Sequence, residues 1–412
     1  MRKEWPTRTL SEVCQIKPPK AEARRRLSGT DLVSFVPMEY LGIDQKILIP
    51  IQEKPLSEVA GSYTYFADDD VLLAKITPCF ENGKLGIAAN LSNGIGFGSS
   101  EYIVFRPDKS MDKEWLYYFL SRESFRTEGA ARMSGAVGHK RVSKEFIESY
   151  PIPVPPLPEQ QRIIGILNEA FEGIATAKAN AEKNLQNARA LFGTGFSAFA
   201  SESEQKSWIR TTAGSIAGPR KCSIRTGPFG SQLLHSEFVD DGIAVLGIDN
   251  AVANEFRWDK RRYITQDKYQ QLVRYRVYPG DVLITIMGTC GRCAIVPDDI
   301  PLAINTKHLC CITLDKSKCI PEYLHAYFLY HPSAQEFLTS QAKGSIMDGL
   351  NMGIINELPL LIPTLDRQRE IVSSLKSLRT DTQRLASIYQ QKLAALDALK
   401  KSLLDQAFSG KL

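Results

Sequence analysis

Short polar loops beside glycines are the features of this 412-residue chain that could do chemistry. Arg, Lys, Asn, Gln, Ser and Glu on such loops can hydrogen-bond to the edges of DNA bases in the major groove. Neighbouring glycines let the backbone approach phosphate groups closely. Candidates in the first half are Lys75, Asn82, Lys84, Ser99, Ser100, Glu101, His139, Lys140 and Arg141. Candidates in the second half are Ser231, Gln232, Thr285, Arg292, Asn305, Thr306, Lys307, His308 and Asn351.

Each candidate also has a plainer interpretation. Any single loop side chain could simply be solvated, and Ser99 or Asn305 could cap a turn. The basic triplet Lys260-Arg261-Arg262 could contact the DNA backbone or only keep the surface soluble. The sequence therefore predicts a binding surface more firmly than it predicts the individual contacts.

Motifs for catalysis are weaker. The sequence has no G-x-x-x-x-G-K-[ST] phosphate loop, no Asn-Pro-Pro-aromatic motif and no glycine-rich S-adenosylmethionine loop after a strand. Asp70, Glu81 and Lys84 could form a nuclease-like set, but Asp70 is more simply a turn residue before a strand. A second-half counterpart, Asp281, has no equivalent of the other two. We predict no catalytic residue in this chain.

Composition sets further bounds. A net charge of +5 and a charged fraction of 24% are ordinary, so any basic surface must be local. No run of 18 apolar residues is present, and the first residues lack the apolar core of a signal peptide, which predicts a cytoplasmic protein without a membrane span. Cys290 and Cys293 have the spacing of a metal or redox pair, but no second ligand pair follows. We predict no metal and no cofactor.

The loops must be positioned by two repeats, residues 1–156 and 205–362. Gly280-Asp281-Val282-Leu283 resembles Asp69-Asp70-Val71-Leu72, and Glu322 follows Glu114 by 208 residues (322 − 114 = 208). The segment 344–349 corresponds to the loop that begins at Gly135. Two α/β repeats with a common frame and different loops suit a protein that reads two targets.

A long helix is predicted after each repeat, over 157–204 (with a short polar linker) and over 363–412. Each opens on a similar stretch, Leu157-Pro158-Glu159-Gln160-Gln161 and Leu365-Asp366-Arg367-Gln368-Arg369. Apolar residues then recur in steps of four and three, as in coiled coils. The stripe residues are Ile163, Leu167, Ile174 and Leu191, then Ile371, Leu375, Leu378, Leu385, Leu396, Leu399 and Leu403. Each stripe could pack on its own repeat, but the length favours two helices packed antiparallel on each other.

These motifs, in this order, resemble the specificity (S) subunit of type I restriction–modification enzymes, the HsdS family. The resemblance covers the whole chain. It rests on the two helix openings, on Thr226-Gly227-Pro228-Phe229-Gly230-Ser231, and on the terminal Ala407-Phe408-Ser409-Gly410-Lys411-Leu412. The first repeat has no stretch like Gly227-Pro228-Phe229-Gly230-Ser231.

The resemblance implies an α+β fold with a pseudo-twofold internal repeat: two target-recognition domains joined by an antiparallel coiled coil of two helices. It further implies binding to a split double-stranded DNA sequence, and docking of two methyltransferase (M) subunits and of restriction/translocase (R) subunits. S-adenosylmethionine, ATP and Mg would then be bound by those partners. Two alternatives remain open: a nuclease fused to recognition domains, and a coiled-coil scaffold that binds proteins.

Overall fold

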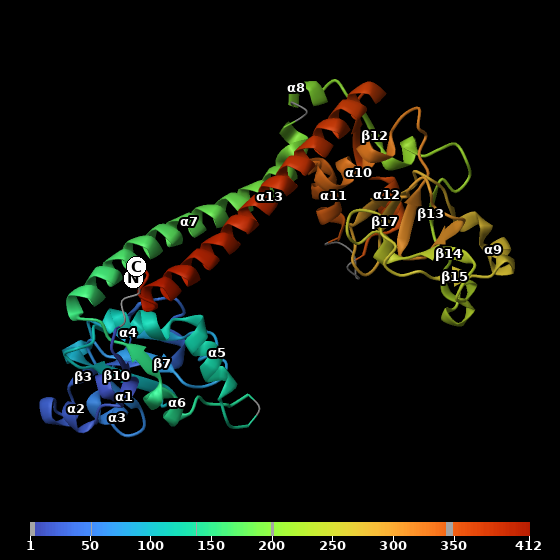
Figure 1. Ribbon diagram of the computed structural model, residues 1–412. Helices are drawn as coiled ribbons and strands as arrows, with labels where there is room; N and C mark the ends of the chain where they lie inside the picture. The colour runs from blue at the N-terminus through green and yellow to red at the C-terminus, as the bar shows by residue number, and fades with distance from the viewer. Residues whose placement is uncertain (1–4, 51, 137, 199–201, 343–348) are drawn as a thin grey trace. The chain divides into compact units, whose positions relative to one another are not determined.

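The computed structural model describes residues 5–50, 52–136, 138–198, 202–342 and 349–412 (Figure 1). The predicted loop segment 344–348 and residues 199–201 of the predicted linker lie outside the described residues. Two compact units divide the chain: unit 1 contains residues 1–182 and 391–412, and unit 2 contains residues 183–390.

Unit 1 contains two main sheets. The first has the strand order β2 (Cys14–Ile16), β10 (Tyr102–Pro107), β7 (Val71–Ala74), β8 (Leu85–Ala88) and β4 (Ile47–Leu48). The second has the order β5 (Gln52–Pro55), β3 (Leu32–Val36), β9 (Ile95–Gly98) and β6 (Thr64–Ala67). A small third sheet pairs β1 (Thr7–Thr9) with β11 (Pro151–Pro153). Strands β7, β8 and β9 are buried along their whole length, which explains why their sequences consist of apolar or small residues without interruption.

The helices of unit 1 cover these sheets. They are α1 (Leu10–Val13), α2 (Ala21–Arg26), α3 (Leu56–Val59), α4 (Lys113–Leu120), α5 (Glu123–Ala131) and α6 (Lys144–Ser149). Asp112 caps α4 by accepting a hydrogen bond from Glu114 N. As expected for core residues at helical spacing, Trp115, Tyr118 and Phe119 are buried.

Unit 2 repeats this topology. Its first sheet has the order β13 (Ile224–Thr226), β20 (Leu309–Ile312), β17 (Val282–Thr285) and β18 (Cys293–Ile295). Its second has the order β15 (Tyr263–Ile264), β14 (Ile243–Leu246), β19 (Ala303–Asn305) and β16 (Arg276–Val277), and β12 (Ile209–Thr212) pairs with β21 (Pro359–Ile362). In both units the second sheet has a parallel central pair, β3 with β9 and β14 with β19. The internal repeat predicted from the sequence is therefore confirmed at the level of strand order.

The helices of unit 2 are α8 (Glu202–Gln205), α9 (Gln266–Leu272), α10 (Pro321–Tyr330), α11 (Pro332–Ala342) and α12 (Met352–Asn356). Short 3₁₀ turns cover residues 38–40, 92–94, 213–216, 230–232, 235–237, 248–250 and 273–275. Among the described residues, no helix has both the length and the apolar character needed to cross a bilayer.

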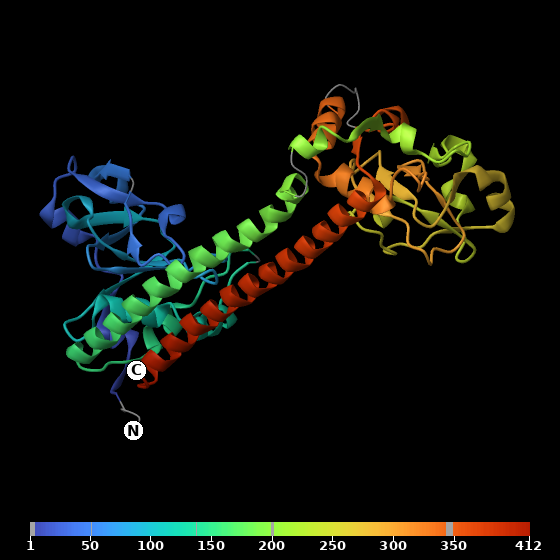
Figure 2. The same ribbon diagram turned by 90° about the horizontal axis from the view of Figure 1, so that it is seen from above.

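The two long helices are α7 (Leu157–Ala198) and α13 (Leu365–Phe408). Within unit 1 they pack antiparallel, and Figure 2 shows the start of α7 beside the end of α13. Arg162 Nη2 donates to Leu412 O at 2.8 Å, whereas Lys178 Nζ lies 2.7 Å from Asp397 Oδ1, so residue numbers rise along one helix as they fall along the other. The predicted antiparallel pairing is confirmed within this unit.

The predicted stripe is only partly correct. Ile163, Leu167, Ile174, Ile371 and Leu375 are buried as predicted, and Leu378, Leu396 and Leu403 are half-buried. Leu191, Leu385 and Leu399 are instead 50%, 38% and 47% exposed.

The physical reason in α13 is a shift of register after Thr382. After Thr382 the less exposed row contains Ala386, Leu393 and Lys400 in place of the predicted 385, 392 and 399, whereas Leu396 and Leu403 keep their predicted places. The shift follows from two consecutive steps of four residues, from Leu378 to Thr382 and on to Ala386. An α-helix has 3.6 residues per turn and drifts against a strict period of 3.5, so an extra step of four restores the contact face.

Candidate nucleic-acid interface

Three loops of unit 1 meet around Lys75. Its backbone N–H donates to Glu101 O at 2.9 Å, and its carbonyl accepts from Val142 N at 3.0 Å. Thr77 N donates to Lys140 O at 2.9 Å. The loop after β7, the turn between β9 and β10, and the segment before Val142 are thus tied together by backbone hydrogen bonds.

An ion pair between Glu101 and Arg141 occupies the surface of this loop cluster. Arg141 Nε donates to Glu101 Oε2 at 2.9 Å, and Nη2 donates to Oε1 at 2.7 Å. The hydrogen bonds from Arg141 hold the pKa of Glu101 below its ordinary value, so the carboxylate is charged at neutral pH. Arginine can bind guanine in a bidentate manner and a carboxylate can accept from the cytosine amino group. The pair therefore presents both chemistries on one exposed loop surface.

Lys75 and the serines complete the cluster. Lys75 Nζ donates to Ser100 O at 2.9 Å and lies 4.0 Å from Glu101 Oε2. Burial lowers the pKa of Lys75, and Glu101 counteracts part of that effect. Ser99 Oγ accepts from Glu101 N at 3.2 Å, so this serine also orders the turn, as its plainer interpretation proposed. His139 and Lys140 are exposed beside Arg141.

A basic hollow that the sequence reasoning missed adjoins this cluster. It has a volume of about 460 Å³, and Lys17, Lys20, Lys75 and Lys144 contribute to its lining. Burial is the main cause that lowers the pKa of Lys20, and the neighbouring charges of Lys17 and Arg24 lower it further. Such a field attracts phosphate groups. The signal in the sequence was Lys17-Pro18-Pro19-Lys20 directly after a strand.

Two candidates of unit 1, Lys84 and Asn82, do not contact the charged side chains of Lys75, Glu101 and Arg141. Lys84 Nζ donates to Met38 O at 2.7 Å and the residue is half-buried, so its ammonium is engaged by the protein itself. Asn82 is exposed on the turn between β7 and β8.

Unit 2 has the same backbone frame with different side chains. Ile286 N donates to His308 O at 2.9 Å, and Ile286 O accepts from Leu350 N at 3.1 Å. By these hydrogen bonds Ile286 takes the place of Lys75, and His308 takes the place of Glu101. Burial lowers the pKa of His308, and so do the neighbouring charges of Lys307 and Arg262.

Buried polar atoms gather around Arg262 in this unit. Its Nη2 donates to Asp249 Oδ1 at 2.7 Å, yet Arg262 Nη1, Asp249 Oδ2 and Thr306 Oγ1 are buried without a hydrogen-bond partner. Buried polar atoms normally find partners, so this cluster is suited to an added polar ligand. Gly247 lies directly against it, because a Cβ there would be 2.7 Å from Arg262 Nη1 and 2.9 Å from Asp249 Oδ1. Arg262 belongs to the basic triplet noted in the sequence.

Of the remaining candidates, Ser231, Gln232 and Arg292 are exposed, and Lys307 is half-buried. Gln232 Oε1 accepts from Tyr275 Oη at 2.8 Å, which orients its amide.

The structure shows intramolecular hydrogen bonds for three candidates of unit 2. Thr285 is fully buried, and its hydroxyl accepts from Arg292 N at 2.9 Å. Asn305 is also fully buried, and its Nδ2 donates to Leu309 O at 3.0 Å. Asn351 caps α12 by accepting from Ile354 N at 2.9 Å, just as Ser143 caps α6. Asn351 therefore corresponds to Ser143 and not to the loop 139–141. Thr285 and Asn305 are buried, whereas Asn351 is exposed and stays a predicted DNA contact.

The nuclease-like set is not assembled. Asp70 is buried and receives two hydrogen bonds from Arg106, at 2.7 and 2.8 Å, while Lys84 binds a backbone carbonyl. Asp281 is likewise buried and binds Arg225 at 2.6 Å. Both aspartates are structural partners of arginine. Throughout the described part of the chain, no cluster of three or more His, Cys, Asp or Glu side chains is arranged to hold a metal.

Comparisons with known proteins point in one direction. A family model described as the type I restriction modification DNA specificity domain matches residues 2–186 and 251–393. The EcoEI specificity subunit of a type I restriction enzyme from Escherichia coli is 38% identical over 175 residues, 40% of this chain and 27% of that protein. The MjaVIII specificity subunit from Methanocaldococcus jannaschii is 24% identical over 330 residues, 74% of this chain and 71% of that protein.

The EcoAI specificity subunit from Escherichia coli is 37% identical, and again the chain spans 27% of the relative's length. Two solved structures share the fold over the full chain. One, from a study of complex assembly and conformational transition of the type I R-M system, has a TM-score of 0.76, is 17% identical and covers 100% of this chain and 99% of that chain. The other, the HsdS subunit from Thermoanaerobacter tengcongensis, has a TM-score of 0.66, is 16% identical and covers 100% and 98%.

Proposed function

The chain belongs to the type I restriction modification DNA specificity family, and we propose on that basis that it is the recognition subunit of such a system. Each repeat reads one half of a split double-stranded DNA sequence. Residues 1–156 form the first target-recognition domain and residues 205–362 form the second. The chain itself performs no catalysis.

One observation carries this proposal: the two units hold different side chains on one backbone frame. Lys75 and Glu101 in unit 1 occupy the positions of Ile286 and His308 in unit 2, with matching backbone hydrogen bonds. A duplicated frame fixes how each loop cluster meets the duplex, whereas the side chains decide which bases it prefers. Two frames with different side chains are expected to prefer two different half-sequences.

In unit 1 we assign the reading of bases to Glu101 and Arg141, with Ser100, His139 and Lys140 beside them. Lys17, Lys20, Lys75 and Lys144 supply phosphate contacts, because their charges surround the hollow next to that pair. In unit 2 the equivalent surface contains Ser231, Gln232, Arg292, Thr306, Lys307 and His308, with Arg262 and Asp249 behind them. Asn82 remains a peripheral candidate.

The long segments 157–204 and 363–412 act as spacer helices and as docking surfaces. Helices α7 and α13 each continue without a break across the boundary between the two units. Exposed Leu385, Ile388 and Leu399 are available for partner subunits. The partners are two methyltransferase (M) subunits and, in the larger assembly, restriction (R) subunits, which bind S-adenosylmethionine, ATP and Mg.

The test is to express the chain with its methyltransferase partner and to map methylated positions in the DNA of those cells. The proposal predicts one motif with two defined half-sequences separated by a fixed gap. DNA binding by the purified complex should also weaken steeply with salt, as phosphate contacts require. Methylation without a shared split motif contradicts the proposal, and so does metal-dependent cleavage by the chain alone.

A further inference from the structure

The two units differ at the outer edge of their first sheet, which an additional strand covers in unit 1 but not among the described residues of unit 2. In unit 1, β4 adds to β8 in parallel, pairing Ile47 with Ile87 and Leu48 with Ala88. Ile87 N donates outward to Lys46 O at 2.8 Å. The side chain of Lys46 then reaches across to the helices.

Two polar side chains receive Lys46 in unit 1. Its Nζ donates to Glu114 Oε2 of α4 at 2.7 Å and to Asn168 Oδ1 of α7 at 2.8 Å. The chain thus covers its own sheet edge and fixes that cover with a charged side chain.

Unit 2 ends its sheet at β18, and among its described residues no strand pairs with the outer edge of β18. Ile295 is the counterpart of Ile87, because it faces Val282 of β17 as Ile87 faces Val71 of β7. Among the described residues, the chain itself covers this edge at Cys293, where Asn254 Oδ1 accepts from Cys293 N at 3.2 Å and His325 Nε2 lies 3.0 Å from Cys293 O. The backbone groups that stay open on β18 are therefore those of Ile295.

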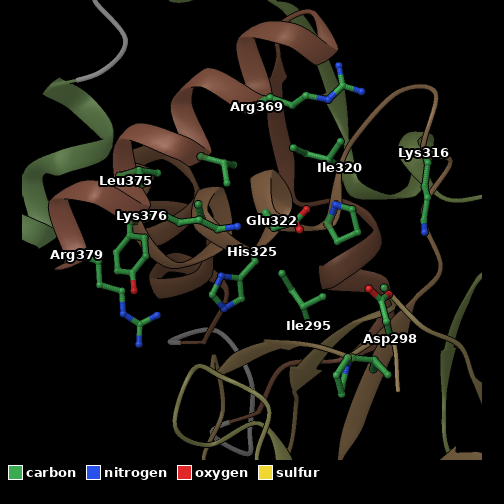
Figure 3. Close-up of a pocket in the computed structure, with 17 residues that line it drawn as sticks. Ile295, Asp298, Lys316, Ile320, Glu322, His325, Arg369, Leu375, Lys376 and Arg379 are labelled. Carbon is green, nitrogen blue, oxygen red and sulfur yellow. The ribbon is translucent and has the colours of Figure 1, made fainter. Parts of the chain in front are cut away.

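A cavity of about 700 Å³ lies along this edge (Figure 3). Ile295 and Asp298 line it on the sheet side, and helices α10 and α13 line it on the other side. Glu322 and Lys376 project into it, and they occupy the positions of Glu114 and Asn168 (322 − 114 = 208; 376 − 168 = 208). The space that Lys46 and β4 fill in unit 1 is therefore open in unit 2.

The charge around the opening selects its occupant. Lys316, Arg369, Lys376 and Arg379 line the cavity together with Asp298 and Glu322. Arg369 and Arg379 are already paired with Asp366 and Glu255, at 2.7 and 3.1 Å, so Lys316 and Lys376 are the cations considered for a guest. Asn168 accepts a hydrogen bond from Lys46 in unit 1. The equivalent position in unit 2 is Lys376, which carries an ammonium group instead of an amide. A guest lysine is disfavoured beside Lys376, whereas a guest carboxylate is attracted.

We propose that an extended acidic segment of a protein partner adds to β18 in parallel and places a carboxylate against Lys376. Open strand edges are ready templates for such addition, in which backbone hydrogen bonds provide affinity and pockets provide specificity. The partner is the methyltransferase subunit, so this inference rests on the proposed function for the identity of the partner. It makes the edge of the second domain a docking site separate from the DNA-facing loops.

Hydrogen–deuterium exchange of the chain alone and of its complex with the methyltransferase subunit tests the strand addition. The Ile295 amide should exchange at least about tenfold more slowly in the complex, because it gains a carbonyl partner. The Ile87 amide is the matched control, since Lys46 O already protects it, and it should be unchanged. Equal exchange of Ile295 in both samples, or slow exchange in the chain alone, overturns the inference.

Charge variants test the occupant. Lys376→Glu should weaken assembly with the methyltransferase subunit by about tenfold, whereas Lys376→Arg should retain it. Lys221→Glu, a charge reversal at an exposed residue of unit 2 that lies outside both the cavity lining and the long helices, is the control; an equal loss there contradicts the inference. If the parent chain forms no complex at all, the proposed function fails, whereas a complex with an unprotected Ile295 refutes only the strand addition.

Discussion

Gln160 and Gln368, which lie 208 residues apart (368 − 160 = 208), make the same three hydrogen bonds in the two units. Gln160 Oε1 accepts from Asp112 N, and its Nε2 donates to Ser110 O and Pro155 O, all at 2.8 Å. Gln368 repeats this with Ile320 N at 3.0 Å, Lys318 O at 2.9 Å and Pro363 O at 3.0 Å. Each fully buried amide ties the start of a long helix to the start of a shorter one. Gln160 joins α7 to α4, and Gln368 joins α13 to α10. This explains why the glutamine occurs in both helix openings.

Gln160→Leu should lower the free energy of unfolding by about 2–4 kcal/mol, because it strands one buried donor and two buried acceptors. Gln161→Leu is the matched control, since Gln161 is exposed and should change stability by less than about 0.5 kcal/mol. Chemical denaturation of the two variants measures the difference. Equal, small effects would show that the amide does not hold the helix in place.

The corrected register of α13 predicts losses of stability of different size for two leucines five residues apart. Leu404→Ala should cost about 2–5 kcal/mol because Leu404 is buried in the core of unit 1. Leu399→Ala should cost less than about 1 kcal/mol because Leu399 is 47% exposed. Thermal or chemical unfolding of both variants checks this. A larger loss for Leu399 would restore the register read from the sequence.

His331 gives the chain a specific sensitivity to acid. Burial lowers its pKa from an ordinary 6.5 to about 4, and its Nδ1 accepts from Ser333 N at 3.2 Å. Between pH 6.5 and 4 the unfolded chain binds a proton that the folded chain refuses, so the free energy of unfolding falls as the pH falls through that window. His331→Asn keeps a cap for the same amide without titrating. Stability of the parent should therefore drop more than that of the variant between pH 7 and pH 4.5, and parallel curves would refute the assignment.

Arg141→Ala should weaken DNA binding by about 1–3 kcal/mol and relax discrimination at one base pair, because it removes a bidentate donor. Arg141→Lys keeps the charge and should lose the discrimination while retaining more of the affinity. Binding is measured against the mapped target and against variants of each position, at several salt concentrations. A uniform loss across all sequences, with a salt slope lower by about one, would make Arg141 a phosphate contact instead. No change would remove it from the interface.

The sequence predicted what duplication and periodicity encode. The repeated strand text, the two helix openings and the loops around Glu101 and Arg141 were all visible, because local patterns and a spacing of 208 residues carry them. The register after Thr382 could not be predicted in this way. A step of three residues from Thr382 reaches Leu385 and a step of four reaches Ala386, and both residue types suit a buried position. Asn351 was matched to the wrong loop, since only the hydrogen bond to Ile354 N identifies it as the counterpart of Ser143.

The sequence pattern alone also could not predict which groups the polar side chains contact. Lys84 and Lys75 look alike in the sequence, and each donates to a backbone carbonyl of its own unit, but only Lys75 also lies beside the carboxylate of Glu101. The sequence placed Thr285 and Asn305 in predicted polar loops, but both side chains are fully buried. Such outcomes depend on packing between distant segments. The same holds for the open edge of β18, which became visible only through its covered counterpart in unit 1.

The central claim is that each repeat reads its own half of a split DNA sequence. Exchanging residues 1–156 for the equivalent repeat of another family member tests it most directly. The donor should keep aromatic residues at the positions of Trp115 and Phe119, because the rings of both pack on Phe408 of α13, at 4.4 and 5.3 Å. The reciprocal exchange of residues 205–362 is the matched control. Methylation mapping of the parent and of both exchanges should show one half-sequence changed and the other retained, with the halves reversed between the two exchanges. A change in both half-sequences from either single exchange would contradict the account.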